Sequence, residues 1–374
     1  MSATPTLRRV FLAVLFCLAT GGVFAVPQVT VLTYNVSGNG TTNWSTNTPQ
    51  AQAIGRELAY LNPDIITFQE IPFTNTWQMP NWVTAFMPGY FLATNSGTDG
   101  YLRSVIASRF PINRSKSWMS RSNLTYFGYN GPFTRDLFEA EIAVPGFAQP
   151  LHVFTTHLKA GTDTTSQQRR AAESAAISNF LVTVFLPTNL APYLLTGDMN
   201  EDLIRSANPQ ALANLTRPPT GLQLTTPTNP VSGSELTISI QSGLFSRYDY
   251  ILPGQLLASN LVGSQVFRTD LLANFPPNLF SNDDQTASDH LPVVMTFANP
   301  YTRPFTVTKF SRSNNAVNLQ WGAVPGGLYR VESSTNLATW TALATNLLTR
   351  NYTGALNTNA SAVQVARLVE LSTR

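Results

Sequence analysis

Residues 193–200 read YLLTGDMN, an apolar run that leads directly into an acid and an amide. Residues 288–290 read SDH and stand directly before a second apolar run, residues 291–297. Short apolar runs bounded by turn residues are typical of buried strands. Carboxylate, amide and imidazole groups at strand ends suit divalent-metal and phosphate-ester chemistry. A Gly-Asp-x-Asn turn standing alone is more often an ordinary β-turn, so its meaning depends on the rest of the chain.

Three further segments have the same form, an apolar run that ends in a polar side chain. Residues 29–36 (VTVLTYNV) predict a strand that ends near Asn35. Residues 65–68 predict a short strand that ends in Gln69 and Glu70, and residues 151–156 predict one that ends at His157. Taken singly, Asn35 is a strand-terminating turn residue and Glu70 a solvated charge.

The chain has three histidines, which differ in their expected roles. His152 and His157 are five residues apart and therefore point to opposite faces of one strand. We expect His152 to be structural and His157 to stand at the strand exit. Residues 247–251 predict a strand in which Asp249 lies between aromatic residues. A charge in that position needs a partner, and His290 is a candidate.

Helices are predicted between these strands. Thr48 and Pro49 form a typical helix start, and the segment Asn62-Pro63-Asp64 is expected to end that helix. Residues 167–181 (QQRRAAESAAISNFL) predict an amphipathic helix with Arg169 and Arg170 on its solvated face. Residues 205–236 are rich in Pro, Thr and Asn and are expected to form a long surface loop.

The polar positions, taken in order, resemble those of the endonuclease/exonuclease/phosphatase superfamily, which has the DNase I-like fold. The resemblance covers roughly residues 28–298. The matching positions are Asn35, Gln69-Glu70, His157, Gly197-Asp198-x-Asn200, Asp249 and Ser288-Asp289-His290. The resemblance implies an α+β catalytic domain, a four-layer αββα sandwich with the site where the named strands end.

The resemblance also implies a bound divalent cation, Mg²⁺ or else Mn²⁺ or Ca²⁺. Carried over, Asn35 and Glu70 would hold the cation, and Asp289 would add a carboxylate. His290, paired with Asp249, would act on the attacking water or stabilise the charged phosphorane. The number of metal ions stays open.

The remaining implied roles concern the water and the phosphate. Asp198 would orient or deprotonate the nucleophilic water, and Asn200 would donate to a phosphate oxygen. His157 would contact a phosphate oxygen or assist the leaving group; which histidine is acid and which is base stays open. Arg103 and Arg135 are either phosphate clamps or plain surface residues.

The stretch THLKAG, residues 156–161, looks closest to secreted nucleases, sphingomyelinases and generic phosphodiesterases. We therefore expect a nuclease-like, metal-dependent phosphodiesterase. The alternatives are a sphingomyelinase-type phospholipid phosphodiesterase, an inositol-phosphate phosphatase, and an inactive scaffold or binding protein. The segment LLANFPPNLF, residues 271–280, contains two prolines, which argues against the paired membrane hairpin of the sphingomyelinase branch.

The N-terminus predicts export. Arg8 and Arg9 precede an apolar stretch, and residues 23–25 (VFA) fit signal-peptide cleavage after Ala25. The single cysteine, Cys17, lies inside this segment, so the mature chain has no disulfides. Secretion without disulfides favours a bacterial secreted or periplasmic protein. We expect a monomer without a membrane span after cleavage.

The charge balance sets a limit on the substrate. Loss of Arg8 and Arg9 lowers the net charge from +3 to +1, so the mature protein is not a basic protein built to bind polyanions over its whole surface. Charged residues make up 11% of the chain, against about 25% in typical globular proteins. A nucleic-acid substrate would therefore depend on local basic groups beside the site.

The sequence changes in character near residue 300. Short alternating stretches separated by Gly, Pro, Asn and Ser predict strands at residues 305–310, 316–321, 329–332 and 339–343. Residues 329–343 (YRVESSTNLATWTAL) look like the fibronectin-like C-terminal modules of bacterial exported enzymes. The expected organisation is a signal peptide over 1–25, a catalytic domain over 26–299 and a small β-sandwich over 300–374.

Overall fold

The structure is a computed structural model that describes residues 27–38, 43–302, 306–313, 316–336, 338–351, 353–359 and 365–371. The signal peptide expected over residues 1–25 lies outside the described residues. The chain divides into two compact units between Pro300 and Tyr301.

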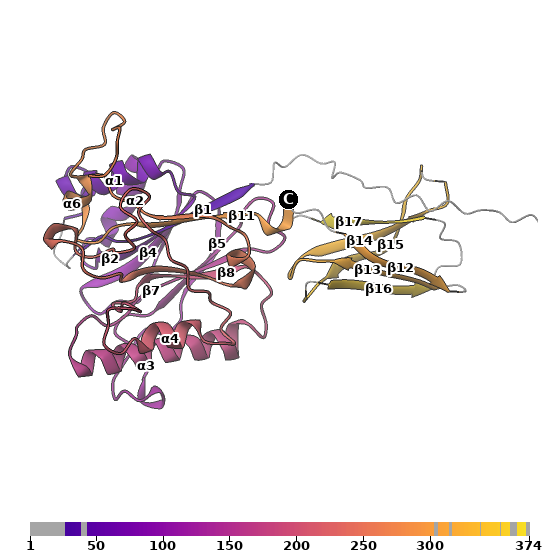
Figure 1. Ribbon diagram of the computed structural model, residues 1–374, viewed down its shortest axis with the longest axis horizontal. Coiled ribbons are helices and arrows are strands. Elements are labelled where there is room, and N and C mark those ends of the chain that lie inside the picture. Colours follow the sequence, from indigo (N-terminus) through magenta and orange to yellow (C-terminus); the bar gives the residue numbers. More distant parts are fainter. Residues whose placement is uncertain are drawn as a thin grey trace, which may run out of the picture. The chain divides into compact units, whose positions relative to one another are not determined.

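Two mixed sheets form the centre of the first unit (Figure 1). The six-stranded sheet has the order β10-β11-β1-β2-β4-β3, and the five-stranded sheet has the order β5-β6-β7-β8-β9. β1 runs parallel to β2, and β7 runs parallel to β8. The strands of the first sheet are β1 Gln28–Asn35, β2 Ile65–Pro72, β3 Phe91–Thr94, β4 Leu102–Ser108, β10 Leu261–Val266 and β11 Val293–Ala298. Those of the second are β5 Ile112–Ser117, β6 Leu137–Ile142, β7 Leu151–His157, β8 Tyr193–Asp198 and β9 Asp249–Pro253.

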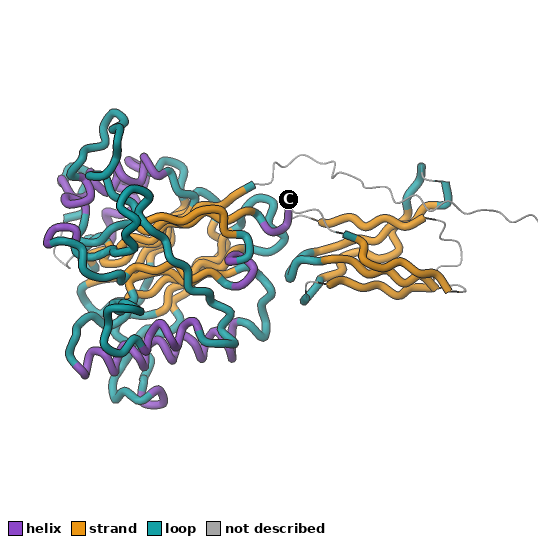
Figure 2. The backbone as a smooth tube through the Cα atoms, in the orientation of Figure 1, coloured by secondary structure: helices purple, strands orange, loops and turns teal. Residues whose placement is uncertain are grey.

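Helices cover the outer face of each sheet, as Figures 1 and 2 show. α1 (Pro49–Leu61) and α2 (Met79–Phe86) pack on the first sheet, and α3 (Thr164–Phe180) and α4 (Gln210–Thr216) pack on the second. The predicted four-layer αββα sandwich is confirmed. The other short elements are α5 Gln255–Ala258, α6 Asp283–Ala287, the 3-10 helices η1 Thr76–Gln78, η2 Thr125–Phe127, η4 Ile240–Ser242 and η5 Pro300–Thr302, and the π-helical turn η3 Leu181–Phe185.

α1 begins and ends where its sequence indicates. The Thr48 hydroxyl accepts a hydrogen bond from the backbone N–H of Ala51, and Pro49 occupies the first turn. The helix ends at Asn62, which adopts a left-handed conformation and donates its backbone N–H to Leu58. These are typical N-cap and C-cap arrangements, so the predicted helix is confirmed.

Two predictions about the second half of this unit were wrong. Residues 210–216 lie within the expected surface loop but form α4, because Ala211, Leu212 and Leu215 are buried against the second sheet. Arg170 was expected on the solvated face of α3 but is buried. Its guanidinium donates to the backbone carbonyls of Lys159 and Gly161, which binds α3 to the loop that follows His157.

Polar side chains join the two sheets through the core. The Thr196 hydroxyl on β8 bonds to the Thr67 hydroxyl on β2 at 2.9 Å. The Gln69 side-chain amide on β2 donates to Thr155 on β7 at 3.0 Å. Buried polar groups that are fully bonded fix one relative position, so these bonds hold the sheets in register with each other.

The second unit is a small all-β sandwich, as predicted. One sheet has the order β12-β13-β16 and the other β15-β14-β17, and side chains from both enter one core that includes Trp321, Tyr329 and Leu368. The strands are β12 Val307–Ser313, β13 Ala316–Gly322, β14 Leu328–Ser334, β15 Thr341–Leu348, β16 Thr353–Asn359 and β17 Val365–Leu371.

In the described part of the chain, no helix is long and apolar enough to cross a bilayer.

Candidate functional site

The two parallel strand pairs bring the polar strand ends together. Asn35 ends β1 beside Gln69 of β2, and His157 ends β7 directly opposite Asp198 at the end of β8. Because the carboxyl ends of parallel strands meet at one edge of a sheet, each sheet presents its polar residues at one edge. The two edges face each other across the sandwich.

A bulge on β2 separates the roles of Gln69 and Glu70. The pairing of β2 with β4 shifts register between Phe68 and Ile71, and Glu70 has a φ of 62°. A non-glycine residue in the left-handed region is uncommon, and bulges of this kind re-aim a side chain. Gln69 points into the core between the sheets, whereas the Glu70 carboxylate belongs to the site.

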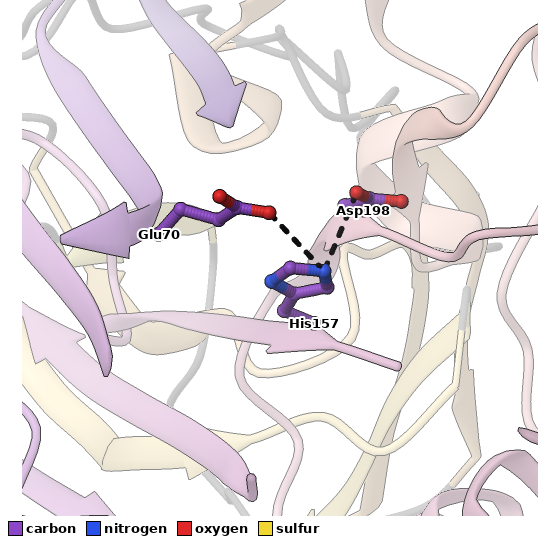
Figure 3. Close-up of side chains that lie close together, drawn as sticks. All are labelled: Glu70, His157 and Asp198. Carbon is purple, nitrogen blue, oxygen red and sulfur yellow. Dashed lines mark ion pairs between the residues drawn. The ribbon is translucent and has the colours of Figure 1, made fainter. Parts of the chain in front are cut away.

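Glu70, His157 and Asp198 form a compact cluster (Figure 3). His157 Nε2 lies 3.4 Å from Asp198 Oδ2 and 3.8 Å from Glu70 Oε1. Asn35 Nδ2 donates to the same carboxylates, at 2.9 Å to Asp198 Oδ2 and 3.2 Å to Glu70 Oε1. A side chain from each of four strands therefore meets at one point.

The GDMN turn holds Asp198 through its backbone geometry. Gly197 has a φ of 133°, and a Cβ there would lie 1.9 Å from the carbonyl oxygen of Thr156, so only glycine fits. Asn200 has a φ of 50°, and its backbone N–H donates to Asp198 Oδ1 at 2.7 Å. The Asn200 side-chain amide donates to the carbonyl of Leu158 at 3.2 Å, which ties the turn to the exit from β7.

A second pair, Asp249 and His290, adjoins this cluster. His290 Nδ1 lies 2.7 Å from Asp249 Oδ2, and His290 Nε2 lies 3.8 Å from Asp198 Oδ2. Ser288 orients the histidine, since its hydroxyl accepts from the His290 backbone N–H and donates to the carbonyl of Asn35. The pairing of Asp249 with His290 that the sequence suggested is present.

Burial and neighbouring charges shift the pKa values of three side chains in the site. Burial lowers the pKa of His290, but Asp249 and more weakly Asp198 raise it to about 10. Burial raises the pKa of Asp198 to about 7, against the attraction of His290. Burial, with the nearby charge of Arg135, holds the pKa of His157 well below its usual value. At neutral pH His290 is therefore a cation and His157 is neutral.

The donor set fits a hard divalent cation. Glu70, His157 and Asp198 each offer an atom within 4.8 Å of the others, and so do Asp198, Asp249 and His290. Carboxylate oxygens are the ligands that Mg²⁺ and Ca²⁺ prefer, and the first group has two. The Asn35 side-chain nitrogen faces these carboxylates, and the Asn35 side-chain oxygen accepts from the Ser37 backbone N–H. To bind the cation through its oxygen, the Asn35 amide would have to be rotated by half a turn.

Asp289 belongs to neither of these two groups among the described residues. It is partly buried beside His290, whose pKa it helps to raise, and its backbone carbonyl accepts from the backbone N–H of Ile240.

The two arginines that the sequence suggested as phosphate clamps differ in their contacts. Arg135 is largely buried, donates to the carbonyl of His157 and lies 3.1 Å from Asp99, whereas Arg103 lies over the ring of Phe73.

Two side chains around the site were missed by the sequence analysis. The Thr237 hydroxyl accepts from the backbone N–H of Asp249 and so fixes the start of β9. Arg170 anchors the loop after His157. Neither carries a sequence signal, because each bonds to a backbone group outside its own element, 9 to 12 residues away. His152 is the structural histidine expected, buried and bonded to Glu139 and Asn189.

Comparisons with known proteins agree with this geometry. The model of the endonuclease/exonuclease/phosphatase family matches residues 32–290. No curated protein gives a significant match. An endonuclease/exonuclease/phosphatase protein from Beutenbergia cavernae is 14% identical with a TM-score of 0.52, covering 92% of this chain and 100% of that one. A 3′ phosphatase from Neisseria, bound to a product DNA hairpin, is 20% identical to this chain with a TM-score of 0.51. The match covers 72% of this chain and 99% of that one.

The structural neighbours share the fold, and the family match spans every strand-end residue from Asn35 to His290. Members of this family use divalent metals, in keeping with the carboxylate and histidine groups described above. The chain belongs to the endonuclease/exonuclease/phosphatase family.

Proposed function

We propose that this phosphoric ester hydrolase is an exported, Mg²⁺-dependent phosphodiesterase that acts on nucleic acid. The observation that carries the proposal is the convergence of Glu70 and Asp198 with a charged Asp249–His290 pair. We assign the activity to a catalytic domain over residues 26–299, preceded by a signal peptide over 1–25. The module over 300–374 is assigned an accessory role, and the protein is expected to act as a monomer.

Glu70 is the first residue proposed to hold the cation, with Asn35 and Asp289 completing the site as the family resemblance implies. Glu70 is the most accessible acid of its cluster, with a side-chain exposure of 21%. When bound, the cation supplies positive charge to the phosphate oxygens. Mn²⁺ and Ca²⁺ have the same preference for oxygen ligands and are expected to bind as well.

The chain's own residues supply the proton transfers. The water oxygen forms a bond to phosphorus as the bond from phosphorus to the leaving oxygen breaks. Asp198, with a pKa of about 7, is suited to take the water proton at neutral pH. The His290 imidazolium stabilises the negative charge that develops on the phosphoryl group. Asn200 and neutral His157 contact phosphate oxygens. The leaving oxygen takes its proton from the His290 imidazolium, and the proton that Asp198 took from the water returns to His290, whose Nε2 lies 3.8 Å from Asp198 Oδ2.

Nucleic acid is the substrate class we favour within this reaction. The Neisseria 3′ phosphatase with the same fold holds product DNA. The segment Leu271 to Phe280 forms no paired hairpin in the structure, which removes the feature by which a sphingomyelinase-type enzyme reaches a membrane. Sphingomyelin and inositol phosphates are the alternative substrates.

The test is a substrate panel of plasmid DNA, RNA, sphingomyelin, inositol phosphates and bis-p-nitrophenyl phosphate, each with Mg²⁺ and with EDTA. EDTA-sensitive cleavage of nucleic acid is expected, and Glu70→Gln should abolish it. Glu141→Gln, which changes a carboxylate on β6 outside both clusters, is the matched control. If choline phosphate is the only product released, the protein is a phospholipid phosphodiesterase of the sphingomyelinase type. No turnover with Mg²⁺, Mn²⁺ or Ca²⁺ would overturn the enzymatic proposal in favour of an inactive scaffold.

A further inference from the structure

Three exposed aromatic side chains follow the strand that carries Glu70. Phe73 lies just past the end of β2, Trp77 lies in η1, and Tyr101 precedes β4. Their exposed fractions are 40%, 69% and 71%. We call Phe73, Trp77 and Tyr101 the aromatic patch. Exposed rings scattered singly are ordinary, whereas rings that gather on one surface mark binding sites.

Backbone contacts hold the aromatic patch together. The Phe73 backbone N–H donates to the carbonyl of Tyr101 at 2.7 Å, which extends the pairing of β2 with β4 beyond Pro72. The Thr76 hydroxyl donates to the carbonyls of Pro72 and Phe73, which fixes η1 and Trp77 to the same strand end. Phe73 is three residues beyond Glu70, which sets an upper limit of roughly 10 Å on the separation of their backbones.

A cation lies against the aromatic patch. The Arg103 guanidinium lies 4.6 Å from the centre of the Phe73 ring. Its Nε is buried and has no hydrogen-bond partner within the described ranges, and it forms none of the ion pairs found there. The carboxylate whose charge acts on Arg103 is that of Asp136, which accepts hydrogen bonds from Asn95 and Ser117 instead. Arginine stays charged in proteins, and a partly desolvated charge gains most from an anionic partner.

We propose that Arg103 and the aromatic patch bind a nucleotide next to the scissile phosphodiester, with an unpaired base stacked on the rings and its phosphate on Arg103. This inference rests on the proposed function and specifies its substrate as a single strand or a frayed end. A single strand offers a flat ring and an anion in each nucleotide, which matches the exposed rings and the guanidinium beside Phe73. Bases within a duplex are already stacked and cannot lie on the rings.

A membrane surface fits the same residues less well. Binding to a bilayer interface relies on a larger apolar face and on several basic residues. The aromatic patch has three rings and one adjacent cation, Arg103, and it continues directly from the strand that carries Glu70. Vesicle binding is therefore an outcome of the test and not the expectation.

The experiment measures binding in EDTA, so that it does not depend on hydrolysis. The full chain is titrated against a fluorescein-labelled oligothymidylate and against the same backbone with abasic residues, by fluorescence anisotropy. The double variant Trp77→Ala/Tyr101→Ala should weaken binding of the oligothymidylate at least about tenfold and leave the abasic strand unchanged. Arg103→Gln should weaken both strands and reduce the salt dependence of binding.

Phe91→Ala is the matched control, because Phe91 is 47% exposed and pairs with the same strand β4 at its other end, opposite Ser108. It should bind both strands as the wild type does. Equal loss of both strands in the aromatic variant, or no loss, would overturn the inference. So would loss of sphingomyelin-vesicle binding with unchanged strand binding. If binding depends on the bases but the protein cleaves no substrate in the panel, the inferred binding of unpaired bases stands. Only the proposed function is then overturned.

Discussion

Replacing Asp249 by Asn should lower the pKa of His290 while keeping a side chain of the same size in place. His290 Nδ1 lies 2.7 Å from Asp249 Oδ2, and the imidazole is buried. Burial alone favours the neutral ring, so its pKa of about 10 depends chiefly on Asp249. The variant tests whether that carboxylate keeps His290 positively charged.

The size of the effect follows from this contact. Loss of an opposite charge at this range lowers a pKa by roughly 1–3 units, which would bring His290 to roughly 7–9. Each unit corresponds to about 1.4 kcal/mol, so the imidazolium loses about 1.4–4 kcal/mol of stabilisation. A pKa of roughly 7–9 still leaves at least about half of the rings charged at pH 7. Hydrolysis should nevertheless fall on the order of 100-fold, chiefly because the imidazolium is stabilised and oriented less well by the amide than by the carboxylate.

The same shift predicts a pH dependence of stability. The pKa of His290 in the folded protein lies above its ordinary value of 6.5. Its contribution to stability is therefore complete below pH 6.5 and is lost as the pH rises through about 10. In Asp249→Asn this loss should be smaller and should end at a lower pH, which urea unfolding at stepped pH will measure.

Imidazole NMR is the direct assay, because the chain contains three histidines. In EDTA the wild type should show one ring, that of His290, protonated up to a pH of about 10. Glu139→Gln is the matched control, since Glu139 pairs with His152 at 2.6 Å outside the site and should leave His290 unchanged. If His290 in Asp249→Asn still titrates near 10, other groups hold its proton and the reasoning is refuted.

Three further predictions concern single residues. Glu70→Gln should lower kcat/KM with Mg²⁺ at least about 100-fold and weaken Mn²⁺ binding in calorimetry; unchanged Mn²⁺ affinity would remove Glu70 from the metal site. Burial raises the pKa of Glu57 to about 8, so its stabilising contribution is full below 4.5 and is lost as the pH rises through 8. Glu57→Gln cannot titrate and should flatten the pH profile of urea unfolding over that range; an unaltered profile would contradict it. Trp82 is fully buried, and its indole N–H donates to the Ala51 carbonyl. Trp82→Ala should therefore lower the free energy of unfolding by about 3–5 kcal/mol in chemical denaturation. A loss below about 1 kcal/mol would be inconsistent with this packing.

The sequence was sufficient for the features that depend on local patterns. Asn35, His157 and Asp198 each end an apolar run, and the structure places all three at strand ends within one compact cluster. The N-cap at Thr48 followed from residue type alone. Such signals need only neighbouring residues, because strand burial and helix capping are decided over a few positions.

The sequence was insufficient where burial depends on distant segments. Arg170 has the composition of a solvated helix face but is buried by the loop that follows β7. Residues 210–216 have the composition of a loop, and packing on the second sheet makes them helical. The left-handed backbone of Glu70 arises from a bulge whose partner strand is distant in sequence. In the second unit, β16 and β17 were not predicted. β16 reads TGALNTN, which is rich in Asn and Thr and lacks strong alternation.

The hydrogen bonds that join the two sheets have a consequence for how the activity appears during folding. Glu70 belongs to one sheet and Asp198 to the other, so neither sheet alone contains the site. The Thr67–Thr196 bond spans the same interface and sets the separation of the two carboxylates. A folding intermediate with both sheets formed but not yet docked would possess its secondary structure and no catalytic centre. Recovery of hydrolysis after dilution from denaturant therefore reports the docking step itself, and it should lag behind the circular dichroism of the strands and helices.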